Sequence, residues 1–370
     1  MKILIGNMFE SNAKTLVNTV NCVGVMGKGV ALEFKKRYPD MYKDYTVRCK
    51  AHHVRPGEPY LYRSFSENSV LNFPTKDHWR SSSKLSYITD GLSWFVDNYD
   101  RLGITSIAFP PLGCGNGGLT WEIVGPIMYH YLNPLPIDIE IYAPFGTKKE
   151  FLSPEFLEAN LIHNPSEVLG ARSVKFNQNW LLILEAIKRI NSRKYVLATG
   201  RTMIQKIAYI LTLEGADMGF VFQQGAYGPY CADVKTALTA FSNANLIVER
   251  PVGQMIRIDV TDNYNKLNVS YSNSDMIAVA RTVDLFSRIK NTEHAELFTT
   301  IIYSYNKLKA SETEVTEEKI YRHVIKWKPH WMKNENKNQT LMEAIRELAL
   351  LKWISPVSTY GLLMEFDDFE

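Results

Sequence analysis

Two glycine-rich segments of the sequence have the composition of anion-binding loops. The first, residues 24–31, reads Gly-Val-Met-Gly-Lys-Gly-Val-Ala and follows the apolar segment 16–21. Glycines let backbone amides approach a phosphate closely, and the N-terminus of a following helix adds unpaired N–H groups and its dipole. The spacing matches neither a P-loop nor a dinucleotide-binding fingerprint. A tight strand-to-helix turn without a ligand is the alternative interpretation.

The second segment, residues 110–119, also follows an apolar run and precedes a helical pattern. Between Gly113 and Gly118 every residue except Cys114 is glycine or asparagine. That composition is costly for a mere connector, because glycine loses more backbone entropy on folding than any other residue. We therefore interpret it as a second backbone cradle, and two cradles at adjacent strand ends can hold one elongated diphosphate. Asn21 could hydrogen-bond a ribose hydroxyl there, although such a residue more often satisfies backbone groups.

Both segments require a sheet that brings strand ends together, and the N-terminal pattern predicts one. Short apolar runs alternate with stretches whose apolar residues recur every three to four positions, which is typical of strands and helices in turn. Such alternation predicts a mostly parallel sheet covered by helices on both faces, with ligands at the carboxyl ends of its strands. Strands are expected at 2–5, 15–20, 70–73, 106–109 and 137–143, and helices at 29–38, 83–99 and 121–132.

The composition changes after residue 147. The segment 148–172 carries prolines, asparagines and serines with little periodicity apart from a short helical pattern at 154–161, and we interpret it as a linker. The rest of the chain, 173–370, is expected to be a mainly helical second domain. Its predicted helices are 180–190, 202–213, 230–244, 274–285, 295–306 and 339–351, with a strand at 255–260.

Length and composition fit a two-domain globular protein. The chain has 370 residues, 45% of them hydrophobic and 22% charged, with a net charge of +3. The charge is too small to indicate a nucleic-acid partner without a local basic groove. The four cysteines lack metal-ligand spacing, so we expect no metal, cofactor or disulfide framework. Without a signal-like or membrane-spanning run, a cytoplasmic location is expected.

The two loops, in this order and with the strand Asn18-Thr19-Val20-Asn21 before the first, resemble those of macrodomains. The resemblance covers 1–147 and implies a three-layer α/β/α sandwich that binds ADP-ribose. Within that family the sequence is most similar to DarG antitoxins, whose macrodomain removes ADP-ribose from thymidine in single-stranded DNA. The resemblance implies ADP-ribose contacts at Asn7, Met8, Asn21, Gly27, Lys28, Gly29, Val30, Thr75, Pro111, Leu112, Gly113, Cys114, Gly115, Asn116, Gly117, Gly118 and Leu119.

Lys76 is the candidate catalytic residue, because DarG-like enzymes carry a catalytic lysine at the matching strand end. An amine beside the anomeric carbon could attack it or polarise the departing base if desolvation lowers its pKa. A solvated surface lysine is the alternative. Trp79 and Arg80 suit a single-stranded DNA edge, by stacking on a base and by meeting a phosphate, whereas Trp79 could also be a loop anchor. His78 is more typical of a structural, hydrogen-bonded histidine.

Two positions depart from the family pattern. Many macrodomains have an aspartate after the first-strand glycine that binds the adenine amine, whereas Asn7 follows Gly6 here. An amide oxygen can still accept that hydrogen bond. The more distantly similar animal terminal ADP-ribose glycohydrolase has an aspartate in its second loop, at about the place of Gly117. The lysine-aspartate pair therefore does not carry over, and Lys76 is expected to act without it.

The second domain resembles the helical antitoxin domain of SocA-like proteins around the Tyr227-Gly228-Pro229 turn. Pro229 is expected to start the helix that follows. The resemblance implies direct binding of a DarT-like toxin. A helix-turn-helix DNA reader is the competing interpretation, but no helix there is rich in Arg, Asn or Gln. The acidic end, 365–370, is either a solvated tail or a contact with a basic groove on the toxin.

The expected function is thus a DNA ADP-ribosyl glycohydrolase antitoxin that also neutralises its cognate DNA ADP-ribosyltransferase by binding it. The alternative is a non-catalytic ADP-ribose reader fused to a protein-binding inhibitor domain. Lys76 argues against the reader. A phosphatase acting on ADP-ribose phosphate shares the fold but gives no role to the basic, aromatic segment 76–80.

Overall fold

The computed structural model describes residues 1–64, 68–161, 176–193, 199–252, 255–267, 269–332 and 335–357. The chain divides into two compact units. Unit 1 comprises Met1–Phe176, Lys235–Glu249 and Thr261–Asn265, and unit 2 comprises Asn177–Val234, Arg250–Val260 and Lys266–Glu370.

Unit 1 is built on a six-stranded sheet in the order β1-β6-β5-β2-β4-β3. All its neighbouring strands are parallel except β3, which runs antiparallel to β4 at the edge. The predicted mixed, mostly parallel sheet is therefore confirmed. The strands are β1 (Lys2–Ile5), β2 (Thr15–Asn21), β3 (Tyr60–Tyr62), β4 (Ser69–Lys76), β5 (Ser106–Phe109) and β6 (Asp138–Ala143).

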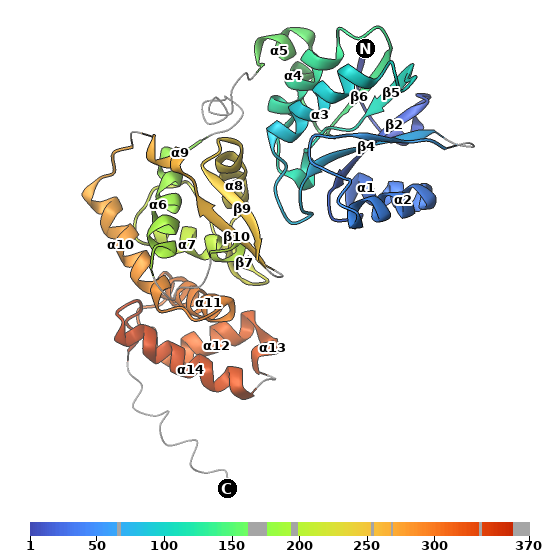
Figure 1. Cartoon of the computed structure of the whole chain (residues 1–370). Helices are drawn as coiled ribbons and strands as arrows, with labels where there is room; N and C mark the ends of the chain where they lie inside the picture. The colour runs from blue at the N-terminus through green and yellow to red at the C-terminus, as the bar shows by residue number, and fades with distance from the viewer. Residues whose placement is uncertain are drawn as a thin grey trace. The chain divides into compact units, whose positions relative to one another are not determined.

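Helices cover both faces of this sheet, because alternate residues of each strand point to opposite sides. On β2, Leu16 and Val20 pack with Phe34 and Met41 of α1 and α2, whereas Val17 packs with residues of α3 and α4. Figure 1 shows these two helix pairs on opposite sides of the strands. The expected three-layer sandwich is confirmed. The helices of unit 1 are α1 (Gly29–Arg37), α2 (Pro39–Lys50), α3 (Leu85–Asn98), α4 (Trp121–Leu132), α5 (Pro154–Ala159), α8 (Asp233–Asn243) and α9 (Asp262–Asn265), with 3-10 turns η1 (Met8–Glu10), η2 (Gly115–Gly117) and η3 (Lys149–Leu152).

Part of the segment expected to be a linker is folded against unit 1. Phe151 of η3 and Phe156 of α5 pack on the core that α3 and α4 share, and Leu157 is buried in that core. The indole of Trp121 donates a hydrogen bond of 2.9 Å to the carbonyl of Phe151. Unit 1 therefore continues past residue 147 in the structure, while 162–172 lie outside the described residues.

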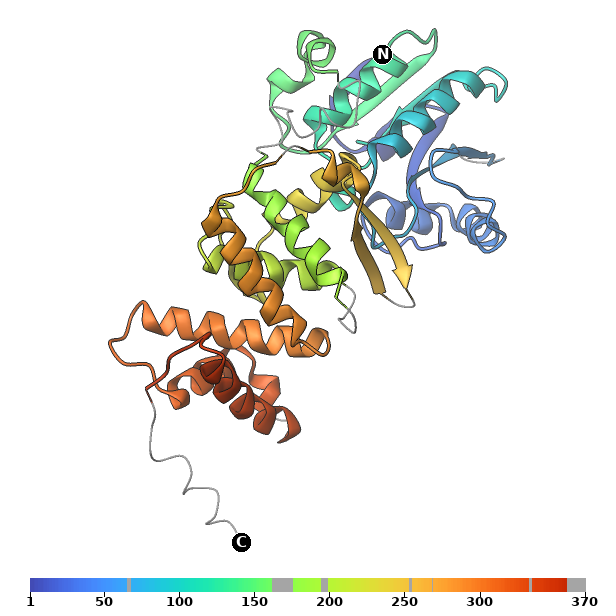
Figure 2. The same ribbon diagram turned by 60° about the vertical axis from the view of Figure 1, so that its left-hand side comes forward.

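Unit 2 is mainly helical, as expected. Its long helix α11 packs against α7, α12 and α14 (Figures 1 and 2). No helix in the described ranges is both long and apolar enough to cross a membrane. The helices are α6 (Leu181–Asn191), α7 (Arg201–Leu213), α10 (Asn273–Ser287), α11 (Thr292–Lys309), α12 (Glu317–Trp327), α13 (Pro329–Met332) and α14 (Glu335–Leu350), with the 3-10 turn η5 (Gln178–Trp180).

The remaining elements are two short hairpins, and one of them shows that a prediction was wrong. The pairs are β7 (Gln223–Gly225) with β8 (Gly228–Tyr230), and β9 (Ile247–Val252) with β10 (Met255–Val260). The expectation that Pro229 starts a helix is wrong, because Pro229 lies in β8 and pairs with Gln224. Proline is tolerated at the edge of a two-stranded sheet. The predicted helix 230–244 begins only at Asp233. The acidic end 365–370 lies outside the described residues.

Candidate functional site

The carboxyl ends of β2, β4 and β5 carry the residues that the sequence singled out. In the sheet β2 lies between β5 and β4 and runs parallel to both. The loop after β2 (the first loop, 22–28), the end of β4 and the loop after β5 (the second loop, 110–120) therefore meet at one edge. This is the edge at which parallel sheets bind ligands, and the predicted site residues of all three segments are brought together there.

Lys76, the last residue of β4, is attached to both loops. Its Nζ donates a hydrogen bond of 2.7 Å to the carbonyl of Asn116 in the second loop. Its own carbonyl accepts from the thiol of Cys22 at 3.3 Å, and the amide of Cys22 donates to the Asp77 carbonyl at 3.0 Å. The pairing of β2 with β4 shifts register between Val20 and Asn21, opposite Lys76. Such irregularities redirect side chains at functional edges, and here the backbone of Lys76 contacts the first loop while its amine contacts the second.

The first loop is folded around the side chain of Asn21, which is 7% exposed. Its Oδ1 accepts from the amides of Val23 at 3.0 Å and Val25 at 3.3 Å, and from the Tyr45 hydroxyl at 3.1 Å. Its Nδ2 donates to the carbonyl of Val25 at 2.6 Å. The oxygen is thus committed to the loop, and only the second hydrogen of Nδ2 is left for a ribose hydroxyl.

The start of α1 offers exposed backbone amides next to the first loop. Gly27, Lys28 and Gly29 are exposed and Val30 is half-buried. Lys28 precedes the helix in an extended conformation without a side-chain cap, so the first helical N–H groups have no intrahelical acceptor. A Cβ on Gly29 would lie 3.2 Å from Nδ2 of Asn116, which shows how closely the two loops approach. Unpaired N–H groups at a helix start are of the kind that bind anions, so the anion contact expected here stays a prediction.

The second loop presents backbone rather than side chains. Gly113, Gly115 and Gly118 have φ angles of 70°, 66° and 85°, a region that favours glycine. Leu112 and Leu119 anchor the loop with buried side chains, so these two predicted contacts can reach a ligand only through their backbone. The same holds for Met8 and Thr75, which are 5% and 3% exposed.

Ser83 is a residue of this site that the sequence did not single out. Its amide donates to the Gly117 carbonyl at 2.9 Å, and its buried hydroxyl has no hydrogen-bond partner among the described residues. A Cβ on Gly117 would lie 2.5 Å from the Ser83 hydroxyl oxygen and 3.9 Å from Cε of Lys76. Ser83 thus occupies the space that a side chain at position 117 would need. In the sequence, the serines at 81–83 stand directly before a helical pattern. They therefore indicated only where a helix begins, and not a site residue.

The two cysteines at this edge are not nucleophiles. Burial, followed by the charge of Asp77, raises the pKa of the Cys22 thiol to about 12. Burial, followed by the charge of Glu122, raises the pKa of the Cys114 thiol to about 12. The thiolate is the reactive form of cysteine, so both thiols are inert at neutral pH. Of the residues that the sequence proposed for this edge, Lys76 is the remaining candidate for a nucleophile.

An aromatic and basic segment follows Lys76. Trp79 is 46% exposed, stacks with the His78 ring at a centroid distance of 5.6 Å, and lies 4.5 Å from the Arg80 guanidinium. Burial, followed by the charge of Arg80, lowers the pKa of His78, which favours the neutral ring. Nδ1 of His78 accepts from the Arg80 amide at 3.2 Å, so His78 has the structural role expected for it.

Asn7 lies just beyond β1, at the same edge of the sheet. Its Oδ1 accepts from the Phe9 amide at 3.1 Å and its Nδ2 donates to Glu10 at 2.9 Å. One lone pair of Oδ1 remains for a ligand amine. The adenine contact expected from Asn7 stays a prediction.

Comparison with known proteins gives the family. Residues 17–128 match the Macro domain family. A DNA ADP-ribosyl glycohydrolase of Mycobacterium tuberculosis is 34% identical over 250 residues, which cover 65% of this chain and 66% of that protein. The solved macrodomain of Thermus aquaticus DarG is 42% identical, and the match covers 39% of this chain and 97% of that structure with a TM-score of 0.37. The N-terminal part of the chain therefore contains a Macro domain.

A further relative has two activities in its name. A DNA ADP-ribosyl transferase-DNA ADP-ribosyl glycohydrolase fusion protein of Thermosipho africanus is 41% identical over 177 residues, or 42% of this chain and 46% of the fusion. The chain thus spans somewhat less than two thirds of the mycobacterial relative and less than half of the fusion.

Proposed function

We propose that this chain is a DNA ADP-ribosyl glycohydrolase of the DarG type, which removes ADP-ribose from thymidine in single-stranded DNA. The observation that carries the proposal is the position of Lys76, whose amine donates a 2.7 Å hydrogen bond to the Asn116 carbonyl of the second loop and whose carbonyl accepts from Cys22 of the first loop. Relatives over 65% and 64% of the chain are named for this activity, which supports the same conclusion.

In this proposal the two loops bind the ADP-ribose part. The first loop and the start of α1 lie beside the distal ribose and one phosphate, and the second loop wraps the pyrophosphate with its backbone N–H groups. Gly115 and Asn116 are exposed at the first residues of η2, where amides have no partner within the turn. Asn7 accepts from the adenine amine.

Lys76 then acts at the anomeric carbon of the distal ribose. As a nucleophile, the neutral amine forms a bond to that carbon while the bond to thymine breaks, and the base keeps the electron pair and takes up a proton. Water then releases ADP-ribose and restores the amine. As a charged group instead, the ammonium stabilises the departing base while water attacks. The Asn116 carbonyl orients Nζ in either case.

The DNA would lie along the segment that follows Lys76. Trp79 offers an exposed aromatic surface and Arg80 a positive charge, which suit a base and a phosphate of a single strand. Such a substrate puts the activity in the cytoplasm.

The mainly helical unit 2 is proposed to bind and neutralise the cognate DNA ADP-ribosyltransferase. The resemblance to SocA-like antitoxin domains that we infer from the sequence around Tyr227-Gly228-Pro229 agrees with this role. So does the Thermosipho africanus relative, which is named as a transferase and a glycohydrolase in one chain.

The proposal is tested with Lys76→Ala in the full chain. We expect release of ADP-ribose from modified single-stranded DNA to fall at least about 100-fold, while binding of free ADP-ribose persists in calorimetry. Lys148→Ala, which removes a lysine that is 72% exposed, is the control and should keep full activity. A fully active Lys76→Ala protein would refute the mechanism. A wild-type protein that binds ADP-ribose but releases none would establish the reader instead.

Reduction with cyanoborohydride during turnover separates the two roles of Lys76. A nucleophilic amine passes through an imine with the opened ribose, which the reductant converts into a stable adduct on Lys76. Mass spectrometry then finds ADP-ribose attached to that residue. No adduct, at unchanged turnover, supports the electrostatic role.

A further inference from the structure

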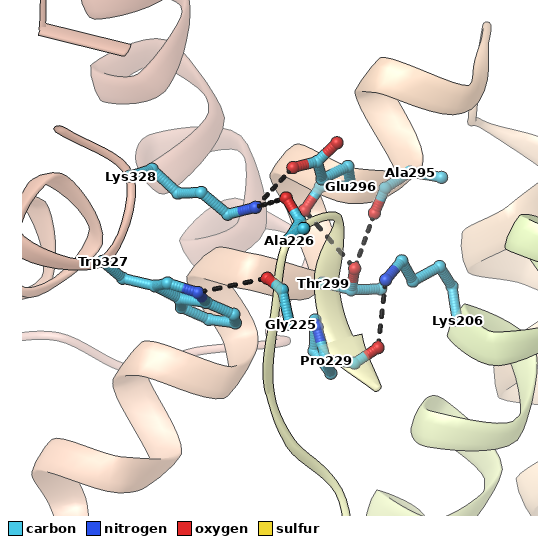
Figure 3. Close-up of polar contacts among 9 residues, drawn as sticks. All are labelled: Lys206, Gly225, Ala226, Pro229, Ala295, Glu296, Thr299, Trp327 and Lys328. Atoms are coloured by element: carbon cyan, nitrogen blue, oxygen red, sulfur yellow. Dashed lines mark hydrogen bonds and ion pairs between the residues drawn. The ribbon is translucent and has the colours of Figure 1, made fainter. Parts of the chain in front are cut away.

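Unit 2 contains a hairpin turn that is held by buried charges although its tip is exposed. The turn joins β7 to β8, where Gly225 pairs with Gly228, and only Ala226 and Tyr227 lie between them. Figure 3 shows this turn surrounded by side chains of α7, α11 and the end of α12. Those helices come from distant parts of the sequence, so the hairpin is fixed by tertiary contacts and not by its own short strands.

Three carbonyls of the hairpin accept hydrogen bonds, one from Lys206 of α7 and two from the adjacent residues Trp327 and Lys328 at the end of α12. The Gly225 carbonyl accepts from the Trp327 indole at 3.3 Å, and the Pro229 carbonyl accepts from Nζ of Lys206 at 3.0 Å. The Ala226 carbonyl accepts from Nζ of Lys328 (Figure 3). The backbone on both sides of Tyr227 is therefore held in one conformation.

The two lysines that hold the hairpin are almost fully buried. Lys206 and Lys328 are each 2% exposed, and Lys328 forms an ion pair of 2.7 Å with Glu296. Burying two cations with one carboxylate is costly, because each loses its hydration. A hydrophobic cluster of the same volume would stabilise the fold at least as well. What these lysines add is a fixed orientation of the turn carbonyls.

Gly228 completes this arrangement. Its φ of 88° favours glycine, and a Cβ there would lie 3.0 Å from Nζ of Lys206 and 3.0 Å from the hydroxyl oxygen of Thr300. The turn is thus packed directly onto α7 and α11. Within the motif Tyr227-Gly228-Pro229 the packing explains the glycine, whereas the tyrosine side chain is 71% exposed and has no such structural reason.

The side chains that the fixed turn presents are aromatic and uncharged. Tyr227 is 71% exposed and Tyr230 is 49% exposed, and Val221 just before β7 is 73% exposed. Between Asp217 and Asp233 the sequence has no charged residue. Exposed tyrosine in an uncharged surface, on a backbone that does not have to be ordered on binding, is typical of the centre of a protein–protein interface.

We infer that the hairpin tip, Tyr227 with Tyr230, is the point at which unit 2 docks on its transferase partner, with the Tyr227 ring inserted into an uncharged apolar pocket of that protein. The inference rests on the proposed function for the identity of the partner. A nucleic acid is the less suitable occupant, because the hairpin offers no lysine or arginine for phosphates. Lys206 and Lys328 are turned inward to carbonyls and do not supply that charge.

The test measures binding of the full chain to its cognate DNA ADP-ribosyltransferase by calorimetry. We expect Tyr227→Ala to weaken binding at least about tenfold, as truncation of a central interface tyrosine does. Ile277→Ala, which truncates a side chain that is 61% exposed on α10 of the same unit, is the matched control and should bind as the wild type does. Glycohydrolase activity should stay unchanged in both variants.

Gly228→Ala provides a second variant that keeps Tyr227 but disturbs the turn. It should weaken binding as well, with circular dichroism showing that the helices remain folded. If the wild type binds the transferase and Tyr227→Ala binds equally well, the inference is wrong while the proposed function stands. If Tyr227→Ala weakens binding to single-stranded DNA and not to the transferase, the hairpin is a nucleic-acid contact and the inference is also wrong. If the wild type does not bind the transferase, the antitoxin part of the proposed function fails with it.

Discussion

Ser83 and Gly117 explain at the level of single residues why position 117 of this domain carries no acidic side chain. The Ser83 hydroxyl occupies the space where a Cβ at position 117 would lie, 2.5 Å away. An aspartate cannot be accommodated there unless Ser83 moves, and Ser83 is fixed by its amide, which donates to the Gly117 carbonyl at 2.9 Å. The Lys76 amine is oriented by a backbone carbonyl instead.

This packing predicts the effect of Gly117→Asp. The variant should lower the free energy of unfolding by about 1–3 kcal/mol, as overpacking of a close contact does, and should not create an active lysine-aspartate pair. Adding Ser83→Gly removes both atoms that the new Cβ meets, so the double variant should regain most of the lost stability. Urea unfolding of the three proteins measures this. A Gly117→Asp protein as stable as the wild type would contradict the packing described.

For single residues, the sequence indicated which residue types lie at this edge of the sheet, but not which of them contact one another. The glycines of both loops were proposed as ligand contacts from their composition and their resemblance to macrodomains, and Lys76 was proposed from that resemblance. The contact of Lys76 with Asn116 joins residues 40 positions apart, and the sequence alone does not show which strand ends become neighbours. Ser83 could not be recognised, because its role depends on the absence of a side chain at Gly117.

At the scale of elements, the second loop depends on two kinds of glycine. Gly113 and Gly115 have nearly the same φ, 70° and 66°, but a Cβ on Gly113 would lie 2.6 Å from Cδ1 of Leu119, whereas one on Gly115 would meet nothing within 4 Å. The positive φ is therefore the only constraint at Gly115. At Gly113 the loop also packs closely on its own anchor.

These two glycines give a matched pair of substitutions. Each change to alanine places a Cβ in the left-handed region and should cost about 1 kcal/mol. Gly113→Ala should cost about 1–3 kcal/mol more, because Leu119 and Ser83 must move. Chemical denaturation gives both values. Equal destabilisation by the two variants would show that close packing is not what requires glycine at position 113.

The helices and strands that the sequence analysis did not predict are short or rich in polar residues. Strand β3 has only three residues and lies at the sheet edge. Helix α2 was missed although Pro39 at its start and the buried Met41, Tyr45 and Cys49, four residues apart, are helix signals. The hairpin β7–β8 has three residues in each strand and includes a proline. Its conformation is set by α7, α11 and α12, which local sequence patterns do not reveal.

For the whole molecule, the alternation of strands and helices was enough to predict the architecture of unit 1, because parallel strands must be covered on both faces. The mainly helical character of unit 2 followed from apolar periodicity. The grouping of α8 with unit 1 was not predicted. Asn243 of α8 accepts a hydrogen bond of 2.7 Å from the Leu85 amide at the start of α3, a contact between positions 158 residues apart.

The buried lysine of the hairpin makes the stability of the chain depend on pH. Burial lowers the pKa of Lys206 to about 8 from its ordinary value of 10.5; the Glu296 charge opposes this shift and the Lys328 charge adds to it. Between these two values the unfolded chain binds a proton that the folded chain has lost. Stability therefore rises with pH through this window, since the cost of burying the charge disappears.

Lys206→Met isolates this contribution. Between pH 8 and pH 9.5 the free energy of unfolding of the wild type should rise by about 1–2 kcal/mol relative to the variant. The range ends below pH 10, because burial raises the pKa values of the neighbouring Tyr209 and Tyr303, and their titration would lower stability at higher pH. Urea unfolding followed by tryptophan fluorescence at the two pH values measures the difference. A constant difference between wild type and variant would mean that Lys206 keeps its ordinary pKa, and that the hairpin carbonyl is held by an amine that stays charged throughout.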